Sequence, residues 1–289
     1  MIKKGIILAG GLGTRLSPIT KSVSKQLLPV YDKPLIFYPL SVLMLCNIKN
    51  ILIIVKKGEK KNFQAALGDS RDLGINLEFK EQIKPTGIPE AFIIGEKFIN
   101  RNSVALILGD NFFYGQGLTE ILKRNFTLKN GSRIFTYPIK DPHNFGIVEK
   151  PTRGKKVRIV EKPKKSKSNL AITGLYLFDK NVSDYSKKIK LSKRKETEIV
   201  DLRNIYNRKN KLKITDLGRG STWLDTGTIE SLLAASTYVQ VVEERQKYKI
   251  ACLEEIALSK KWINKKNIIN RIKFYGNCSY SMYLKKLLN

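Results

Sequence analysis

Runs of consecutive apolar residues recur in the first part of the chain, and amphipathic segments separate them. Apolar runs at 5–9, 51–55 and 104–108 predict strands that are buried on both faces of a sheet. The stretch 60–67 follows the second run and has a helical pattern. Because strands that alternate with helices form parallel sheets covered by helices, this part predicts an α/β, Rossmann-like fold.

The pattern changes in the middle of the chain. Strand-like segments separated by turns lie at 133–140, 146–150, 157–160 and 170–178. We expect antiparallel or mixed strands there, so that the sheet as a whole is mixed but mostly parallel.

The last part of the chain has helical patterns. A long amphipathic segment at 227–247 has Thr226 or Thr228 available as an N-cap. Shorter helical segments follow at 254–261, 262–269 and 280–288. Without a Gly-, Pro- or Ser-rich linker or an internal repeat, we expect one α/β domain at 1–250 and a small helical appendage at 251–289.

Composition and cysteine content narrow the class of protein. The chain has 289 residues and 42% hydrophobic residues, enough for one sizeable core. No apolar run reaches the roughly 20 residues of a membrane span, and the start of the chain lacks a signal-peptide cleavage site. Cys46, Cys252 and Cys278 are odd in number and widely spaced, which argues against a disulfide framework or a zinc site. We therefore expect a cytoplasmic protein with no membrane partner.

The net charge of +29 arises from 54 basic and 25 acidic residues. Such a charge favours polyanions such as nucleic acid. However, the lysines are scattered, their densest cluster at 162–167 resembles a loop, and the aromatic residues form no RNA-recognition signature. We attribute the charge to compositional bias and expect no specific nucleic-acid partner, with a polyanion-binding protein on this fold as the alternative.

A glycine-rich loop follows the first apolar run. Three glycines, Gly10, Gly11 and Gly13, precede Arg15, and Lys25 lies shortly beyond. Glycines allow a tight turn whose N–H groups approach an anion, and arginine suits phosphate oxygens. The loop is not a dinucleotide fingerprint, which needs a third glycine at 16, nor a Walker A motif, which needs a lysine at 11. It predicts a triphosphate cradle, or else a plain turn between a strand and a helix.

Further motifs extend this pattern along the whole chain. They are Gly109-Asp110-Asn111, Glu161-Lys162-Pro163, Thr173-Gly174-Leu175-Tyr176 and Trp223-Leu224-Asp225-Thr226-Gly227-Thr228. In residues, order and approximate spacing the chain resembles the sugar nucleotidylyltransferases, and the segments 31–36 and 106–111 resemble its short bacterial members that use dTTP. The resemblance implies transfer of a thymidylyl group from dTTP to glucose 1-phosphate. Use of UTP or of another sugar phosphate is the alternative.

The reaction that the resemblance implies needs cations rather than a general base. A sugar phosphate has a second pKa of about 6, so it is already largely dianionic at neutral pH. The resemblance implies that Asp110 and Asp225 bind Mg²⁺, a metal held by one or two carboxylates and by substrate phosphates. It also implies that Arg15 binds the β- and γ-phosphates, that Lys25 lies near the reacting centre, and that Lys162 binds the sugar phosphate.

The resemblance assigns the remaining site residues to two halves, a nucleotide half at 1–110 and a sugar-phosphate half at 111–226. The nucleotide-binding positions are Leu8, Gly10, Gly11, Gly13, Thr14, Arg15, Gln26, Gln82, Pro85, Gly87 and Asp110. The sugar-phosphate positions are Asn111, Phe145, Gly146, Glu161, Lys162, Ile172, Tyr176, Arg194 and Trp223. The amide of Gln82 has both a donor and an acceptor for a thymine or uracil edge.

The chain departs from the family pattern near the base and near the sugar. Gly87-Ile88-Pro89-Glu90 stands where the family commonly has Gly-Leu-Ala-Gln, so a carboxylate replaces an amide. Phe145 lacks the hydroxyl of the usual tyrosine. His143 is the only histidine, and we interpret it as structural rather than as a base.

The tail of the chain bears on assembly and regulation. The resemblance implies a homotetramer with a second nucleotide-sugar site, to which dTDP-rhamnose binds as an inhibitor. The candidate effector residues are Gly115, Arg219, Cys252 and Glu255.

Overall fold

The computed structural model describes residues 1–149, 157–192 and 195–288. The strands in these residues are β1 (Lys4–Ala9), β2 (Pro29–Val30), β3 (Lys33–Pro34), β4 (Asn50–Lys56), β5 (Asn76–Gln82), β6 (Val104–Leu108), β7 (Asn111–Gly115), β8 (Ser132–Pro138), β9 (Gly146–Glu149), β10 (Arg158–Glu161), β11 (Leu170–Phe178), β12 (Leu212–Asp216) and β13 (Ser221–Asp225). The α-helices are α1 (Phe37–Leu45), α2 (Lys60–Leu67), α3 (Glu90–Ile94), α4 (Glu96–Ile99), α5 (Leu118–Asn125), α6 (Val182–Ser186), α7 (Ile199–Arg208), α8 (Ile229–Gln246), α9 (Leu253–Ser259), α10 (Lys265–Tyr275) and α11 (Ser279–Lys286).

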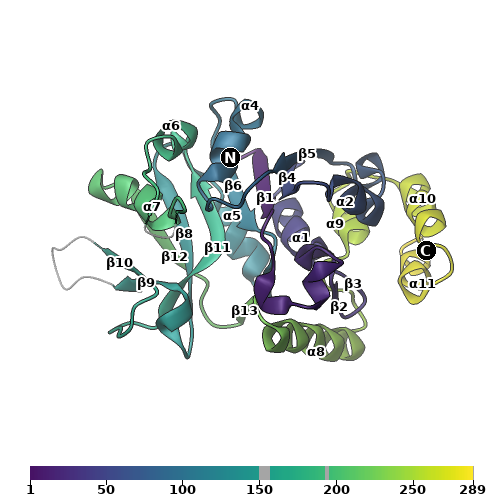
Figure 1. Cartoon of the computed structure of the whole chain (residues 1–289). Helices are drawn as coiled ribbons and strands as arrows, with labels where there is room; N and C mark the ends of the chain where they lie inside the picture. The colour runs from purple at the N-terminus through teal and green to yellow at the C-terminus, as the bar shows by residue number, and fades with distance from the viewer. Residues whose placement is uncertain (150–156, 193–194, 289) are drawn as a thin grey trace.

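A nine-stranded mixed sheet forms the centre of the molecule (Figure 1). Its main path runs β10-β9-β11-β6-β1-β4-β5, and β8 pairs with both β11 and β12. Strand β1 pairs in parallel with β4 and β6, and β4 pairs in parallel with β5. The strands expected at 5–9, 51–55 and 104–108, and the helix at 60–67, are confirmed, and so is the α/β fold class.

The two faces of this sheet explain why its central strands are uniformly apolar. Ile6 and Leu52 belong to one buried hydrophobic cluster, whereas Ile7 and Ile53 belong to another. Since successive side chains of a strand point to opposite faces, a strand covered on both sides needs apolar residues at every position.

The strands expected in the middle of the chain are also confirmed. The pairs β9–β10, β6–β11 and β8–β11 are antiparallel, whereas β8–β12 is parallel. A separate two-stranded antiparallel sheet joins β7 to β13 and places Asp225 opposite Asn111. This small sheet brings together two segments that lie more than a hundred residues apart.

Helix α8 begins at a capping box in which Thr228 and Ser231 exchange side-chain and backbone hydrogen bonds. Of the two expected caps, Thr228 is therefore the one used. The helix expected at 262–269 is wrong in its bounds. The side chain of Asn264 accepts hydrogen bonds from the N–H groups of Lys266 and Asn267, so α10 begins after Asn264 and continues to Tyr275.

The tail helices pack onto the main structure. Leu253, Ala257, Ile268 and Leu284 are buried in the same hydrophobic cluster as one face of the sheet. In Figure 1, α10 and α11 lie at the end of the molecule opposite β9 and β10. The division into a domain at 1–250 and an appendage at 251–289 stays a prediction.

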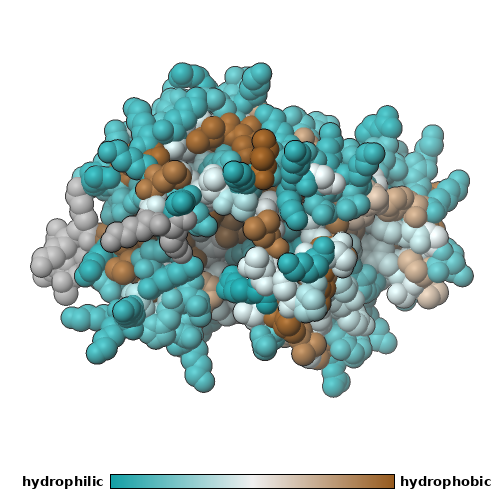
Figure 2. Space-filling model, viewed as in Figure 1, coloured by the Kyte–Doolittle hydropathy of each residue, from teal (hydrophilic) through white to brown (hydrophobic). Residues whose placement is uncertain are grey.

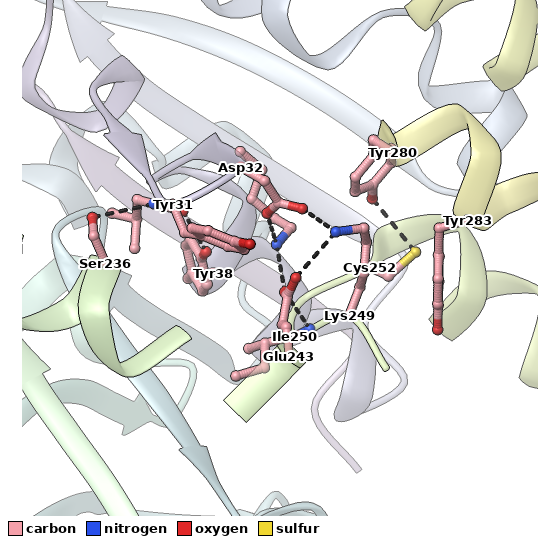
Figure 3. A network of polar contacts seen from close by, with 12 residues as sticks. Tyr31, Asp32, Tyr38, Ser236, Glu243, Lys249, Ile250, Cys252, Tyr280 and Tyr283 are labelled. Carbon is pink, nitrogen blue, oxygen red and sulfur yellow. Dashed lines mark hydrogen bonds and ion pairs between the residues drawn. The ribbon is translucent and has the colours of Figure 1, made fainter. Parts of the chain in front are cut away.

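A network of charged groups connects the β2–β3 hairpin to the end of α8 (Figure 3). The Nζ of Lys33 lies 2.9 Å from Glu243 Oε1 and also contacts Asp32. Lys249 bridges Glu243, at 3.1 Å, and Asp32. Because Lys33 and Glu243 are almost fully buried, each charge depends on its partners, and the network fixes how α8 meets the hairpin.

On the face shown in Figure 2, hydrophilic residues cover most of the surface and hydrophobic residues form separate patches. Among the described residues, no helix combines the length and the apolar character that a membrane crossing requires. All three cysteines are free thiols, with Cys46 and Cys252 buried.

Candidate active site

The glycine loop leaves the carboxyl end of β1 and turns into a short 3₁₀ helix at Thr14–Leu16. Gly13 has a left-handed backbone, with φ of 63°, and its carbonyl accepts a 2.8 Å hydrogen bond from Thr20 Oγ1. A Cβ atom on Gly10 would lie only 2.2 Å from Gln82 Oε1. The left-handed backbone therefore favours glycine at 13, and a larger residue at 10 would displace the Gln82 amide.

A pocket of about 280 Å³ opens near the carboxyl ends of β1 and β6. It brings together eleven of the predicted site residues from both halves of the chain: Arg15, Asp110, Asn111, Phe145, Gly146, Glu161, Lys162, Ile172, Tyr176, Trp223 and Asp225. The pocket is also lined by residues that we did not predict: Ile88, Leu108, Asn144, Gly174, Ile199 and Arg203. Ligands of open α/β sheets bind at this edge, where the strand order changes direction.

Lys25 and Asp110 form a close ion pair at this edge. Lys25 Nζ lies 2.6 Å from Asp110 Oδ2, and the lysine side chain is only 6% exposed. Burial on its own raises the pKa of Asp110, but the Lys25 ammonium and a hydrogen bond from Asn111 outweigh it and hold that pKa below its ordinary value. Asp110 is therefore ionised at neutral pH.

Asp225 ends β13 beside Asp110. The next residue, Thr226, donates both its N–H and its hydroxyl to the Asp110 carbonyl, at 3.1 and 2.8 Å. Burial and the Asp110 carboxylate raise the pKa of Asp225 to about 6, although Lys25, Arg15 and Lys162 oppose this. Two neighbouring carboxylates that repel one another fit a divalent cation, which would relieve the repulsion.

Arg15 approaches the same carboxylate from the glycine loop. A Cβ atom on Gly227 would lie 3.0 Å from Arg15 Nη2 and 3.3 Å from Asp225 Oδ1. The absence of a side chain at Gly227 thus lets the guanidinium and the carboxylate share one side of the pocket.

Asn111 anchors the floor of the sugar-phosphate half. Its Oδ1 accepts hydrogen bonds from the Gly174 N–H at 2.9 Å and from Trp223 Nε1 at 2.6 Å. Phe145 packs edge-on against Trp223, with ring centroids 5.3 Å apart. Phe145 thus contributes an aromatic wall to this half of the pocket.

Glu161 and Lys162 enter the pocket from the end of β10. Lys162 has a left-handed backbone, with φ of 45°, and its N–H donates to the Phe145 carbonyl at 3.0 Å. The Glu161 carboxylate lies 3.4 Å from Arg203 Nη2. With this strained backbone at Lys162, the side chains of Glu161 and Lys162 both line the pocket.

Arg203 is the charged residue among those that the sequence analysis did not predict. It is 1% exposed, and its Nη1 finds no hydrogen-bond partner in the described part of the chain. Its spacing in the sequence could have revealed it. The buried face of α7 consists of Ile199, Leu202, Arg203 and Tyr206. An arginine on an apolar helix face needs an anionic or carbonyl partner, which here is Glu161.

Of the predicted base-binding residues, Gln82 ends β5 and Gln26 lies in a short 3₁₀ helix at Lys25–Leu27. Gln26 is buried, and its Oε1 has no partner among the described residues. Gln82 Nε2 donates to Glu90 Oε2 at 2.5 Å. The turn at 85–87 is held by Thr197, whose N–H donates to the Thr86 carbonyl at 2.7 Å.

The other predicted nucleotide-binding positions belong to β1 and the loop that follows it. They are Leu8, Gly10, Gly11 and Thr14.

His143 and the candidate effector residues are not among the residues that line this pocket. Arg194 lies outside the described residues. His143 contacts the Pro163 carbonyl through its ring, at 2.8 Å. A second pocket of about 320 Å³ is lined by three of the four candidate effector residues, Gly115, Cys252 and Glu255, whereas Arg219 is not among its lining residues.

Comparison with known proteins identifies the family. A sequence profile described as nucleotidyl transferase matches residues 4–241. The chain belongs to this family. It is 50% identical over 285 residues to a glucose-1-phosphate thymidylyltransferase of Neisseria gonorrhoeae and 48% identical over 285 residues to one of Neisseria meningitidis, with 99% of each chain covered in both cases.

A solved structure supports the fold. A Bacillus anthracis protein described as a glucose-1-phosphate thymidylyltransferase, in complex with sucrose, superposes with a TM-score of 0.74 at 36% identity. The match covers 81% of this chain and 94% of that one. The family that the motifs indicated and the Rossmann-like fold that the hydrophobic pattern predicted are confirmed.

Proposed function

We propose that this protein transfers a thymidylyl group from dTTP to α-D-glucose 1-phosphate and releases dTDP-glucose and pyrophosphate. The observation that carries the proposal is the single pocket in which Arg15, Asp110, Lys162 and Asp225 meet. Relatives about half identical to this chain over nearly its whole length are named for this activity.

The reaction is a displacement at phosphorus. An oxygen of the sugar phosphate attacks the α-phosphorus of dTTP, and the bond from that phosphorus to the oxygen bridging to the β-phosphate breaks. The attacking phosphate needs no base because it is already largely dianionic. The protein therefore contributes chiefly by holding two anions together and by stabilising charge.

Asp110 and Asp225 would hold Mg²⁺. The ion would neutralise phosphate charge at the reacting centre. Lys25 keeps Asp110 ionised through the contact at 2.6 Å, and Arg15 lies on the side from which pyrophosphate leaves.

The sugar phosphate occupies the other half of the pocket. Lys162 binds its phosphate, and Glu161 accepts hydrogen bonds from sugar hydroxyls. Arg203 holds the Glu161 carboxylate from behind, at 3.4 Å. Phe145 and Trp223 form a wall beside the sugar, and Asn111 anchors the floor beneath it.

Measurement of pyrophosphate release from dTTP, glucose 1-phosphate and Mg²⁺ tests the proposal. UTP and CTP, and other hexose 1-phosphates, run in parallel to define the substrates. We expect dTTP with glucose 1-phosphate to give the highest kcat/KM. Absence of pyrophosphate release with every pair would contradict the proposed function.

Assembly and compartment belong to the same proposal. We place the enzyme in the cytoplasm, where its three free cysteines suit a reducing medium. We assign it a homotetramer with a nucleotide-sugar effector site at the pocket that Gly115, Cys252 and Glu255 line. Light scattering that gives a monomer mass at micromolar concentration would refute the assembly.

A further inference from the structure

Arg203 places a buried charge with few partners at the wall of the sugar-phosphate half. Its Nε donates to the Ile199 carbonyl at 3.3 Å, and its Nη2 lies 3.4 Å from Glu161 Oε2. Both distances are long for hydrogen bonds, and Nη1 has no partner in the described part of the chain. Because a buried N–H group without a partner lowers the stability of a protein, packing alone does not account for an arginine at this position.

Glu161 is held on one side only. The Arg203 contact engages its Oε2, and among the described residues no donor contacts its Oε1. A carboxylate accepts hydrogen bonds and cannot donate them. The Glu161 side chain is 28% exposed and lines the pocket, so Oε1 remains available to a ligand that brings a donor, such as a hydroxyl group.

Gly146 makes room for this pair of charges. A Cβ atom on Gly146 would lie 2.9 Å from Glu161 Oε2 and 3.3 Å from Arg203 Nη2. All three residues line the same pocket. The missing side chain at Gly146 thus lets the carboxylate and the guanidinium meet at the pocket wall.

We infer that Arg203 is a positioning residue for the sugar, and this inference rests on the proposed function. By holding Oε2 of Glu161, Arg203 leaves Oε1 to accept a hydrogen bond from one hydroxyl group of the hexose. Arg203 acts through Glu161 and does not itself bind the substrate. The pair therefore selects hexose 1-phosphates that carry this hydroxyl over the corresponding deoxy sugars.

Arg203→Met tests the role of the guanidinium through pyrophosphate release, with each substrate varied in turn. We expect the KM for glucose 1-phosphate to rise at least about tenfold and the KM for dTTP to change less than about twofold, the scale of one hydrogen bond lost on the sugar side alone. The midpoint of thermal unfolding should not fall, because the unpartnered N–H group is removed and Glu161 keeps its contact with solvent. A lower midpoint with an equal rise in both KM values would show a merely structural role and overturn the inference.

Deoxy sugars identify the hydroxyl that Glu161 binds. The 2-, 3-, 4- and 6-deoxy forms of glucose 1-phosphate are compared with glucose 1-phosphate in both proteins. In the wild type we expect one of them to lose at least about tenfold in kcat/KM, and in Arg203→Met we expect that loss to shrink below about threefold, since Glu161 is no longer held. The same loss in both proteins would contradict the inference.

Arg208→Met is the matched control, because Arg208 is exposed on the same helix and its variant should keep the wild-type values. If the wild-type protein releases no pyrophosphate, the proposed function and the inference fail together. If the wild type is active and Arg203→Met has the same KM for glucose 1-phosphate, the inference alone fails.

Gly146→Ala covers the case in which Arg203→Met does not fold. The added methyl group would press on Glu161 Oε2 and Arg203 Nη2 and separate them, although both residues remain. The wild-type loss with the critical deoxy sugar should then shrink at least about threefold, which corresponds to part of one hydrogen bond. An unchanged loss in Gly146→Ala would refute a positioning role for Arg203.

Discussion

Replacement of Asp225 by asparagine should stabilise the metal-free protein while it greatly lowers turnover. Burial and the adjacent Asp110 carboxylate raise the pKa of Asp225 from near 4 to about 6. The native state therefore holds a proton more tightly than the unfolded state. As the pH rises from about 4 to about 6, the free energy of unfolding falls, and above pH 6 the loss is complete.

The size of the effect follows from that pKa. A rise of about two pKa units corresponds to about 3 kcal/mol, and the part of the side chain that solvent reaches screens some of it. Asparagine has no charge to bury, so Asp225→Asn should gain about 1 to 3 kcal/mol at pH 7.5. Loss of a carboxylate at the reacting centre should lower kcat at least about a hundredfold.

Urea unfolding in the presence of a chelator measures the stability, at pH 7.5 and at pH 5. The advantage of Asp225→Asn should shrink toward pH 5, where Asp225 is mostly protonated in the native wild-type protein. Asp184→Asn, at an exposed aspartate of α6, should change stability little at either pH. An Asp225→Asn protein that is less stable than wild type at pH 7.5, or equally stable at both pH values, would refute the electrostatic argument.

Other substitutions and conditions give further checks. Asp110→Asn leaves Lys25 without its carboxylate, so we expect an at least about hundredfold fall in kcat at saturating Mg²⁺ with the circular dichroism spectrum unchanged; near-normal turnover would contradict the two-carboxylate site. Arg271→Ala leaves the buried Glu254 without its 2.8 Å partner, and urea unfolding should show a loss of about 3 to 5 kcal/mol. Binding of DNA or RNA should be weak, independent of sequence and steeply reduced by salt in filter-binding assays, so sequence-selective binding at physiological salt would disprove the attribution of the charge to composition.

The strands were predictable where burial leaves a local pattern. The apolar runs at 5–9 and 104–108 identify β1 and β6 because both faces of those strands are covered. The small β7–β13 sheet was not predicted, since the pairing of Asn111 with Asp225 depends on contacts between distant segments. Similarly, the helix predicted at 262–269 begins too early, because the Asn264 cap sets the start of α10.

In the candidate site too, local motifs could be predicted, whereas contacts between distant residues could not. The motifs predicted eleven of the residues that line the pocket, because phosphate and metal chemistry restrict which residue types occur there. They could not predict that Arg203 holds Glu161, or that Glu90 accepts a hydrogen bond from Gln82. Both are contacts between side chains, and the orientation of a side chain depends on its neighbours in space rather than on its neighbours in sequence.

The hydrogen bonds of Asn111 have a consequence for the synthesis of the protein on the ribosome. Its Oδ1 accepts hydrogen bonds from the Gly174 N–H and from the indole of Trp223. The floor of the pocket therefore forms only after the segments around Asn111, Gly174 and Trp223 have all been synthesised. The nascent chain reaches β13 only after about three quarters of its length has been synthesised. A truncated product that ends before Trp223 would carry the glycine loop but no complete pocket, so it would not compete with the finished enzyme for sugar phosphate.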